Sequence, residues 1–399
     1  MEPLMSMTLT NLQDAASNAS VIRLNVDLSP LTADGLVFPP TYAAIDKDGS
    51  PHIDFRKAWV DGSVRDVVVL DSVQSQANRI EQVILSAKTE QRLAYPDIRV
   101  TFPTDPDEPD YSVLQLSHRI FDVTLQCSTL GESPFFETPI GQRIRASRPS
   151  NATALFEQAP VTLLLGAWDS HAAGGPQAAK LPRLLTSEII GLDAVPVNVS
   201  ATKTDPMDIR KNSAELVAAS PGSGRLFELK AEGAKDKSRK PSEFGFGSVL
   251  STDKPRAASI SMARQTSLLS CSGLRQLGFP EDSGEIDASR NLAARTVLAA
   301  LGLYGLLAQN EAGYRLRSRC ELVPHSSAKL EVIGRTLDDV TRFDLGAEDA
   351  LKLLEEALGN AERHGLAWKA DLELTADDRL TALVRRSRIA AGSGDDSGE

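Results

Sequence analysis

The chain has 399 residues, of which 41% are hydrophobic and 24% charged, and its net charge is −11. This hydrophobic fraction excludes a wholly disordered chain, and 27 glycines with 22 prolines exclude a fibrous one. The acidic total argues against a protein coated in basic surface for non-specific nucleic-acid binding.

The N-terminal third predicts strands followed by an amphipathic helix. Residues 21–28 alternate between apolar and polar, as in a half-buried strand, and residues 67–70 are a continuous apolar run, as in a fully buried one. Asp71 or Ser72 can then cap a helix, with Gln74 as a capping-box partner of Asp71. The apolar stripe of this helix is Val73, Ala77, Ile80, Ile84 and Ala87, and its polar side carries Ser75, Asn78, Arg79 and Gln82.

The middle of the chain predicts a strand over 161–167, a glycine turn at 174–175 and a helix over 177–190. Backbone N–H groups at such a helix N-terminus attract anions, and Lys180 and Arg183 would add positive charge. An ordinary strand-to-helix turn is the alternative. The turn lacks the Gly-Lys-Ser/Thr end of a P-loop, so the sequence does not predict nucleotide hydrolysis.

The C-terminal half begins with residues 195–258, where weak periodicity and many Lys, Ser, Gly and Pro residues predict an extended insertion or hairpin. Gly365 ends the last predicted helix. The further predicted elements are a strand near 260–263, helices near 265–277, 287–308 and 347–361, alternating strands at 314–321 and 368–374, and a disordered tail at 391–399.

Charge is unevenly distributed along the chain. Residues 141–275 have a net charge of +6, whereas residues 1–140 and 276–399 have net charges of −10 and −7. The acidic total therefore conceals a basic middle, which contains most of the segments discussed below.

The sequence predicts a cytoplasmic protein without a membrane span. No basic region precedes an apolar stretch at its start, and the longest apolar run, residues 297–308, is shorter than the roughly 18 residues of a spanning helix. Three widely spaced cysteines fit neither a disulfide framework nor a zinc knuckle. We expect no metal and no cofactor. His118 is open to two interpretations, a general base or a hydrogen-bonded structural residue.

Several segments together carry a resemblance to a known family: 71–81, 165–170, 179–181, 187–191, 205–207, 240–247 and 316–324. In this order they resemble the backbone subunit of the type I-U (also called I-G) CRISPR interference complex, of the Cas-seven group in the RAMP superfamily. The resemblance covers about residues 65–325. Asn78 stands where that group has one of two basic residues on the helix.

The resemblance implies an α+β fold with an RRM-like (ferredoxin-like) palm, an inserted thumb hairpin and helical additions. It implies one elaborated domain over residues 1–390, with 195–258 as the thumb-like insertion. It also implies a non-catalytic subunit that binds CRISPR RNA, assembles in several copies along this guide with other subunits of the complex, and presents the guide to target DNA.

The predicted RNA-binding residues fall into three groups. The first group lies on the predicted helix after residues 67–70, which the resemblance implies contacts guide-RNA phosphates; it comprises Ser72, Gln74, Ser75, Asn78 and Arg79. Further donors and cations are His118, Arg119, Lys180, Arg183, Lys203 and Lys240. Phe244 and Phe246 are candidates for stacking on bases, although an ordinary packing role explains them equally well.

Two other functions stay open. Some relatives in type III complexes cut target RNA with a loop aspartate, so Asp205 and Asp208 in the insertion make a metal-dependent endoribonuclease the first alternative. A binding module unrelated to RNA is the second.

Overall fold

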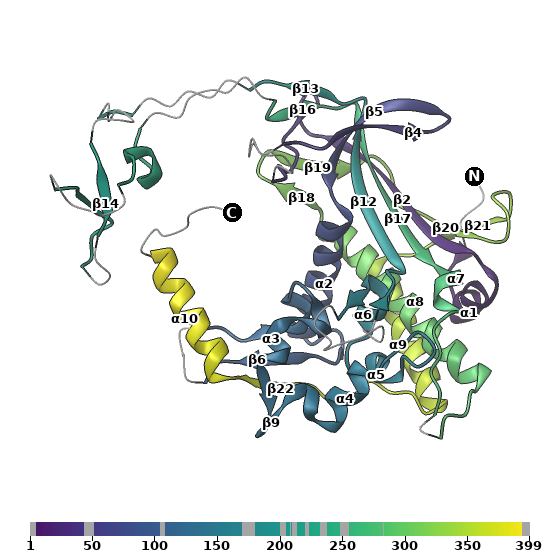
Figure 1. The fold of residues 1–399 in the computed structure, drawn as a ribbon. Helices are drawn as coiled ribbons and strands as arrows, with labels where there is room; N and C mark the ends of the chain where they lie inside the picture. The colour runs from purple at the N-terminus through teal and green to yellow at the C-terminus, as the bar shows by residue number, and fades with distance from the viewer. Residues whose placement is uncertain are drawn as a thin grey trace. The chain divides into compact units, whose positions relative to one another are not determined.

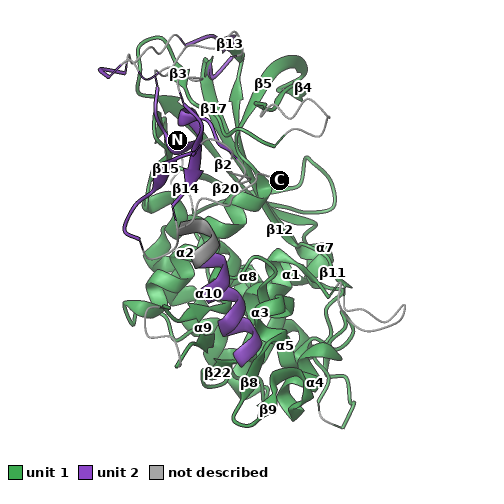
Figure 2. Ribbon diagram, turned by 60° about the vertical axis from the view of Figure 1, so that its left-hand side comes forward, with its two compact units in different colours: residues 1–195, 258–376 green, residues 196–257, 377–399 purple. Residues whose placement is uncertain are grey.

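A computed structural model describes residues 5–43, 52–103, 108–169, 180–199, 205–207, 209, 214–219, 223–231, 238–247, 255–281 and 283–392. The chain forms two compact units, coloured green and purple in Figure 2. Unit 1 comprises residues 1–195 and 258–376, and unit 2 comprises residues 196–257 and 377–399. Unit 2 therefore contains most of the segment for which the sequence predicts an insertion.

A ten-stranded sheet is the centre of unit 1 (Figure 1). In spatial order its main strands are β1 (Met5–Ser6), β21 (Val340–Asp344), β20 (Lys329–Ile333), β2 (Val21–Pro30), β17 (Met262–Ser270), β12 (Leu185–Leu192), β5 (Ser63–Asp71) and β4 (Phe55–Val60). The hairpin of β18 (Tyr314–Arg317) and β19 (Cys320–Pro324) joins the sheet at β2. The four strands from β20 to β12 are antiparallel to their neighbours.

Helices contact this sheet: α2 (Val73–Thr89) packs on β12, α7 (Cys271–Leu274) on β2, and α8 (Ala288–Glu311) on β17. Helix α8 also contacts α2, α1 (Leu9–Asn18) and α9 (Ala347–Arg363). Among the described residues, α8 alone is long and apolar enough to span a membrane by length and composition. Since 83% of its most apolar stretch is buried inside the fold, α8 is a core helix.

Strand β2 confirms the predicted alternation. Ile22, Leu24, Val26 and Leu28 are at most 2% exposed, whereas the residues between them are half-buried. Each buried aliphatic side chain contributes about 1.5–3 kcal/mol to folding. The buried run of β5 and the helices α2, α8 and α9 are also confirmed, as is the mixed α+β class.

The strand predicted over 161–167 is wrong, because residues 160–165 form helix α6 (Pro160–Leu165). A short, wholly apolar run suits a helix that is buried all round as well as it suits a buried strand. Pro160 lies in the first turn of the helix, where its missing N–H leaves no hydrogen bond unmade.

The helix predicted over 177–190 is also wrong, and of the helix predicted near 265–277 only α7 forms. Residues 180–181 form β11 (Lys180–Leu181), and β12 and β17 occupy most of the rest. Burial alternates along these two strands, but the buried positions include the polar residues Ser187, Gln265 and Ser267. The sequence therefore lacks the alternation of apolar and polar residues by which a strand is recognised. Residues 170–179 lie outside the described residues, and strands rather than a helix follow them. The anion site predicted at a helix N-terminus there is therefore wrong.

The rest of unit 1 is a five-stranded sheet with short helices. The sheet has the order β7 (Tyr111–Ser112), β6 (Ile98–Thr101), β22 (Leu372–Ala376), β8 (Ser128–Leu130) and β9 (Ser133–Pro134). The short helices are α3 (Val123–Gln126), α4 (Pro139–Arg145) and α5 (Thr153–Gln158), with 3-10 turns at Val113–Gln115, Arg119–Phe121 and Phe135–Glu137. Strand β22 begins later than the predicted 368–374.

Unit 2 contains the hairpin of β14 (Leu216–Ala218) and β15 (Phe227–Leu229), a 3-10 turn at Pro241–Phe244 and helix α10 (Asp378–Gly392). The chain leaves unit 1 near β13 (Val195–Val197) and re-enters it near β16 (Ala257–Ser259), which pairs with β3 (Leu36–Val37). Helix α10 follows the helix that the sequence predicts to be the last, and residues 393–399 lie outside the described residues.

Candidate nucleic-acid interface

The N-terminus of α2 forms as predicted with Ser72, one of the two candidates, as its cap, so the capping box predicted between Asp71 and Gln74 is wrong. The Ser72 hydroxyl accepts a hydrogen bond from the backbone N–H of Ser75 at 3.3 Å, which satisfies one of the free donors of the first turn. Gln74 and Asn78 are exposed on this helix. The Ser75 hydroxyl donates to the Asp71 carboxylate at 2.8 Å, so this side chain already has a partner within the protein.

Arg79 also has partners within the protein. Its Nε lies 2.9 Å from Oδ2 of Asp71, and its Nη2 donates to the carbonyl oxygen of Leu316 at 2.8 Å. Asp71 is fully buried, and a second arginine, Arg317, lies 3.4 Å from its Oδ1. A buried carboxylate needs such a counter-charge, so the structure gives Arg79 a stabilising role. Its predicted phosphate contact stays a prediction.

A buried polar cluster behind Asp71 was not predicted. The amide of Gln76 donates to Asp71 at 2.6 Å, and its carbonyl oxygen accepts from Ser187, Gln265 and Gln309 at 2.7, 2.9 and 3.0 Å. These residues come from α2, β12, β17 and α8, so the cluster joins α2 and α8 to the sheet. The available signal was a glutamine beside the apolar stripe of α2, one residue before Ala77.

Four predicted site residues line one pocket of about 660 Å³. His118 and Arg119 reach it from the 3-10 turn, and Lys180 and Arg183 reach it from β11 and the chain that follows. Gly166 ends α6 beside it with φ +76°, where an added Cβ would lie 3.0 Å from the backbone nitrogen of Arg183. The pocket wall therefore depends on glycine at this position.

Two of these cations, Arg119 and Arg183, already have hydrogen-bond partners within the protein. Arg119 forms a bidentate ion pair with Glu81 of α2, with distances of 2.6 and 3.0 Å and exposed fractions of 12% and 3%. Burial raises the pKa of Glu81 and Arg119 opposes this rise. The Nε of Arg183 donates to the carbonyl oxygen of Leu165 at 3.0 Å, and burial and the neighbouring Arg119 lower its pKa. After Glu81 offsets Arg119, the charges of Lys180 and Arg183 leave the pocket positive.

Trp168 lines the same pocket and was not predicted as a site residue. It lies on β10 (Ala167–Trp168), directly opposite Lys180 on β11, and its side chain is 62% exposed. The Lys180 ammonium lies 6.0 Å from the ring centroid, within cation–π range. Only the position of Trp168 within segment 165–170 could have indicated it in the sequence.

The predicted stacking pair lies in unit 2. Phe244 and Phe246 pack against Phe227, with ring centroids 5.5 and 5.3 Å apart, and both are half-buried. Lys240 is exposed at the start of the 3-10 turn, and its backbone N–H donates to Glu243. The predicted contact Lys203 lies outside the described residues.

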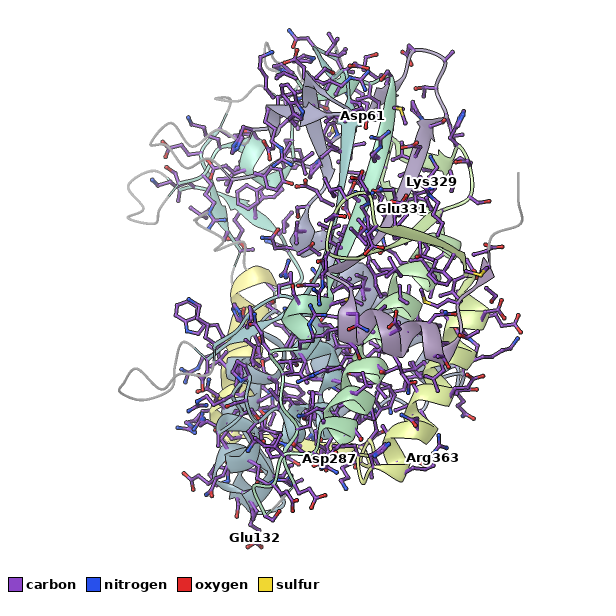
Figure 3. The ribbon with its side chains drawn as sticks, turned by 90° about the vertical axis from the view of Figure 1, so that its right-hand side faces the viewer. Asp61, Glu132, Asp287, Lys329, Glu331 and Arg363 are labelled. Carbon is purple, nitrogen blue, oxygen red and sulfur yellow. The ribbon has the colours of Figure 1, made fainter. Side chains whose placement is uncertain are left out.

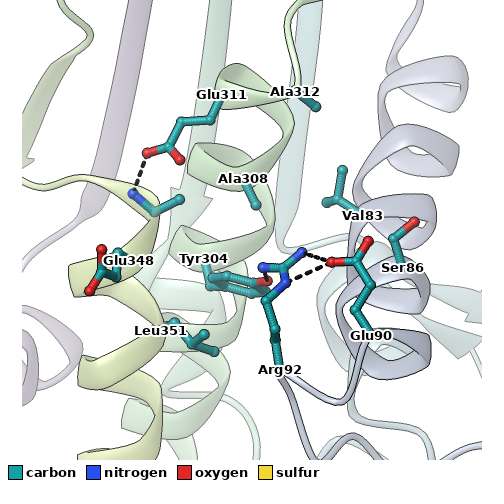
Figure 4. Close-up of a pocket in the computed structure, with 11 residues that line it drawn as sticks. Val83, Ser86, Glu90, Arg92, Tyr304, Ala308, Glu311, Ala312, Glu348 and Leu351 are labelled. Atoms are coloured by element: carbon teal, nitrogen blue, oxygen red, sulfur yellow. Dashed lines mark hydrogen bonds and ion pairs between the residues drawn. The ribbon is translucent and has the colours of Figure 1, made fainter.

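A second pocket, of about 640 Å³, has the opposite charge (Figure 4). Glu90, Glu311 and Glu348 line it, and its arginine, Arg92, donates to Glu90 at 2.7 Å. Tyr304 also lines this pocket, and its hydroxyl oxygen accepts a hydrogen bond from Nη1 of Arg92 at 3.4 Å. A polyanion is repelled by this arrangement, so we place no RNA there.

The outer face of the large sheet carries ion pairs. Glu331 on β20 (Figure 3) lies 2.7 Å from Arg23 and 3.1 Å from Arg342, and it is itself buried. Arg264 on β17 lies 2.8 Å from Asp61. These arginines are neutralised within the protein, which makes this face a poorer phosphate site than the pocket at Trp168.

Comparison with known proteins adds a family. Residues 22–196 match the family model of the CRISPR-associated protein GSU0053, and this segment contains α2, β12 and all the residues that line the pocket at Trp168. No curated protein matches the chain. A similar solved structure is the crystal structure of Thermofilum pendens Csc2, with 12% identity, coverage of 98% of this chain and 87% of that chain, and a TM-score of 0.26. A TM-score this low supports no conclusion about the fold or the function of this chain. The similarity to the family of the CRISPR-associated protein GSU0053 therefore lies in residues 22–196, a little under half of the chain.

Proposed function

We propose that this protein is the CRISPR RNA-binding backbone subunit of a type I-U/I-G interference complex. The observation that carries the proposal is the positive pocket inside the family-matched segment, where Lys180, Arg183 and His118 meet the exposed ring of Trp168. Cations together with an aromatic ring are what single-stranded nucleic acid requires of a protein surface.

An RRM-like palm is part of the proposal. Strands β20, β2, β17 and β12 lie side by side in this order, all antiparallel, and the chain passes through them as β2, α2, β12, β17, α8 and β20. This is the strand order of the ferredoxin-like arrangement. We assign the thumb-like role to residues 196–257 of unit 2.

The proposal includes assembly and location. Several copies would follow one guide in the cytoplasm, together with other subunits of the complex, and would present the guide for pairing with target DNA. The subunit would be non-catalytic. In support, the Asp205 carboxylate accepts hydrogen bonds from the backbone N–H groups of Met207 and Ile209, so it shapes a local turn. Asp208 lies outside the described residues.

The test is the RNA content of the complex purified from cells that express a CRISPR array. Lys180→Ala should lower the amount of bound guide and reduce the salt slope of RNA binding by about 0.7 per subunit, the value for one phosphate contact. Lys329→Ala is the matched control, because Lys329 is an exposed lysine on β20 (Figure 3), away from the pocket. A purified wild-type complex without nucleic acid would contradict the proposal.

A second assay tests the non-catalytic assignment. The assembled complex is incubated with magnesium and RNA complementary to its guide, and the RNA should remain intact. Cleavage that is lost in Asp205→Ala would contradict this assignment and favour the endoribonuclease.

A further inference from the structure

Trp168 is unusually placed for a tryptophan. This residue type is largely buried on average because its ring is the largest apolar surface that a side chain offers. Here the side chain is 62% exposed on a two-residue strand, and its register with Lys180 holds it at the pocket.

The surroundings of the ring favour a nucleobase over an apolar protein surface. Lys180 supplies a cation 6.0 Å from the ring centroid, and Arg183 lines the same pocket. The neighbouring backbone carbonyls of Leu165 and Gly166 already accept from Arg183 and Arg119, so they do not make the pocket negative. The pocket volume of about 660 Å³ falls within the range of roughly 300–1,000 Å³ that suits small ligands.

We infer that Trp168 is a stacking platform for one unpaired base of the bound RNA, with an adjacent phosphate held by Lys180 and Arg183. This inference rests on the proposed function and specifies one of its contacts. Every base has a π-face, so stacking here is tolerant of sequence. That tolerance suits a subunit that must accept any guide.

Binding measurements on the full chain test this inference directly. Fluorescence anisotropy with labelled single-stranded oligoribonucleotides should show affinity weakened roughly 5- to 150-fold in Trp168→Ala. Trp168→Phe should retain most of the affinity. Trp59→Ala is the matched control, because Trp59 is 73% exposed on β4 and does not line the pocket. Circular dichroism establishes that each variant is folded.

A second measurement uses the fluorescence of the Trp168 ring. The sequence has three tryptophans, Trp59, Trp168 and Trp368. With Trp59 and Trp368 replaced by Phe, RNA should quench the remaining fluorescence, and oligonucleotides whose bases are replaced by abasic linkers should not.

The outcomes separate the inference from the proposed function. Unchanged RNA affinity in Trp168→Ala, or no quenching while RNA binds, would overturn the stacking role and leave the RNA-binding function intact. Loss of a protein subunit from the complex in Trp168→Ala, with RNA affinity unchanged, would reassign the ring to a protein contact. No binding of RNA by the unaltered chain, alone or in its complex, would overturn both.

Discussion

The ion pair between Asp71 and Arg79 decides whether Arg79 serves the fold or the RNA. The Asp71 carboxylate is fully buried and accepts from Ser75, Gln76, Arg79 and Arg317 at 2.8, 2.6, 2.9 and 3.4 Å. Arg79→Ala would leave this buried charge with one arginine at the longest of these distances. We therefore expect a loss of stability even if no RNA is present.

The size of the loss follows from burial. Removing one partner of a buried pair costs about 3–5 kcal/mol. Arg317 remains and Arg79 is 29% exposed, so we expect a loss at or below the bottom of this range, about 2–3 kcal/mol, for Arg79→Ala. Combining Arg79→Ala with Asp71→Ala should cost less than the sum of the single changes, with a coupling energy of about 2 kcal/mol.

The assay is urea unfolding of the chain without RNA, followed by circular dichroism, with stability changes taken from the shift in midpoint. Asn78→Ala is the control, because Asn78 is the exposed neighbour of Arg79 on α2 and its loss should cost less than about 0.5 kcal/mol. An unchanged midpoint for Arg79→Ala, with guide RNA lost from the complex, would refute the structural role and restore the phosphate contact predicted from the sequence.

Three further predictions concern backbone, thiols and pH. In thermal unfolding, Gly166→Ala should destabilise the protein by about 2 kcal/mol more than Gly131→Ala. Both glycines have positive φ, but an added Cβ would contact the backbone at Gly166 and would meet open space at Gly131. Equal losses would contradict the close contact at Gly166. Burial raises the pKa of the Cys271 thiol to about 11. In a thiol titration, the partly exposed Cys127 should therefore react in the native state, and Cys271 should react only after denaturation. Rapid reaction of Cys271 in the native state would contradict its burial. Burial raises the pKa of Glu331 but its two arginines outweigh this and lower it, so its stabilisation is present above its ordinary pKa and is lost as pH falls through the folded one. The deficit of Glu331→Gln in urea unfolding, about 1 kcal/mol at pH 7, should therefore shrink toward pH 3, and a constant deficit would contradict this.

The sequence predicts an element well where hydrophobicity alone decides the fold. The alternation of residues 21–28 and the stripe of α2 correspond to β2 and to the buried side of that helix. The predictions for β12 and β17 are wrong because their inward serines and glutamine are buried only through partners on other elements. Those partners come from distant parts of the chain and leave no local pattern.

The candidate site divides in the same way. Local spacing indicated Lys180 and Arg183 as a pair, and both line the pocket, although Lys180 lies on β11 and Arg183 in the chain between β11 and β12 rather than on the predicted helix. Their meeting with His118 and Trp168 depends on how α6 and the 3-10 turn pack, which periodicity does not encode. Arg79 and Arg119 look like free cations in the sequence because their carboxylate partners become visible only in the fold.

The buried polar cluster at Gln76 also constrains how the chain can misassemble. Ser187 pairs with Ser267 across β12 and β17, and both face inward toward Gln76. A slip of β12 by one residue would turn the Ser187 hydroxyl outward and bring Glu188 into the core without a partner. Apolar contacts alone discriminate weakly between such registers, because these strands are only partly apolar. The cluster therefore favours one strand pairing, because only the correct alignment lets Ser187, Gln265 and Ser267 form the hydrogen bonds described here.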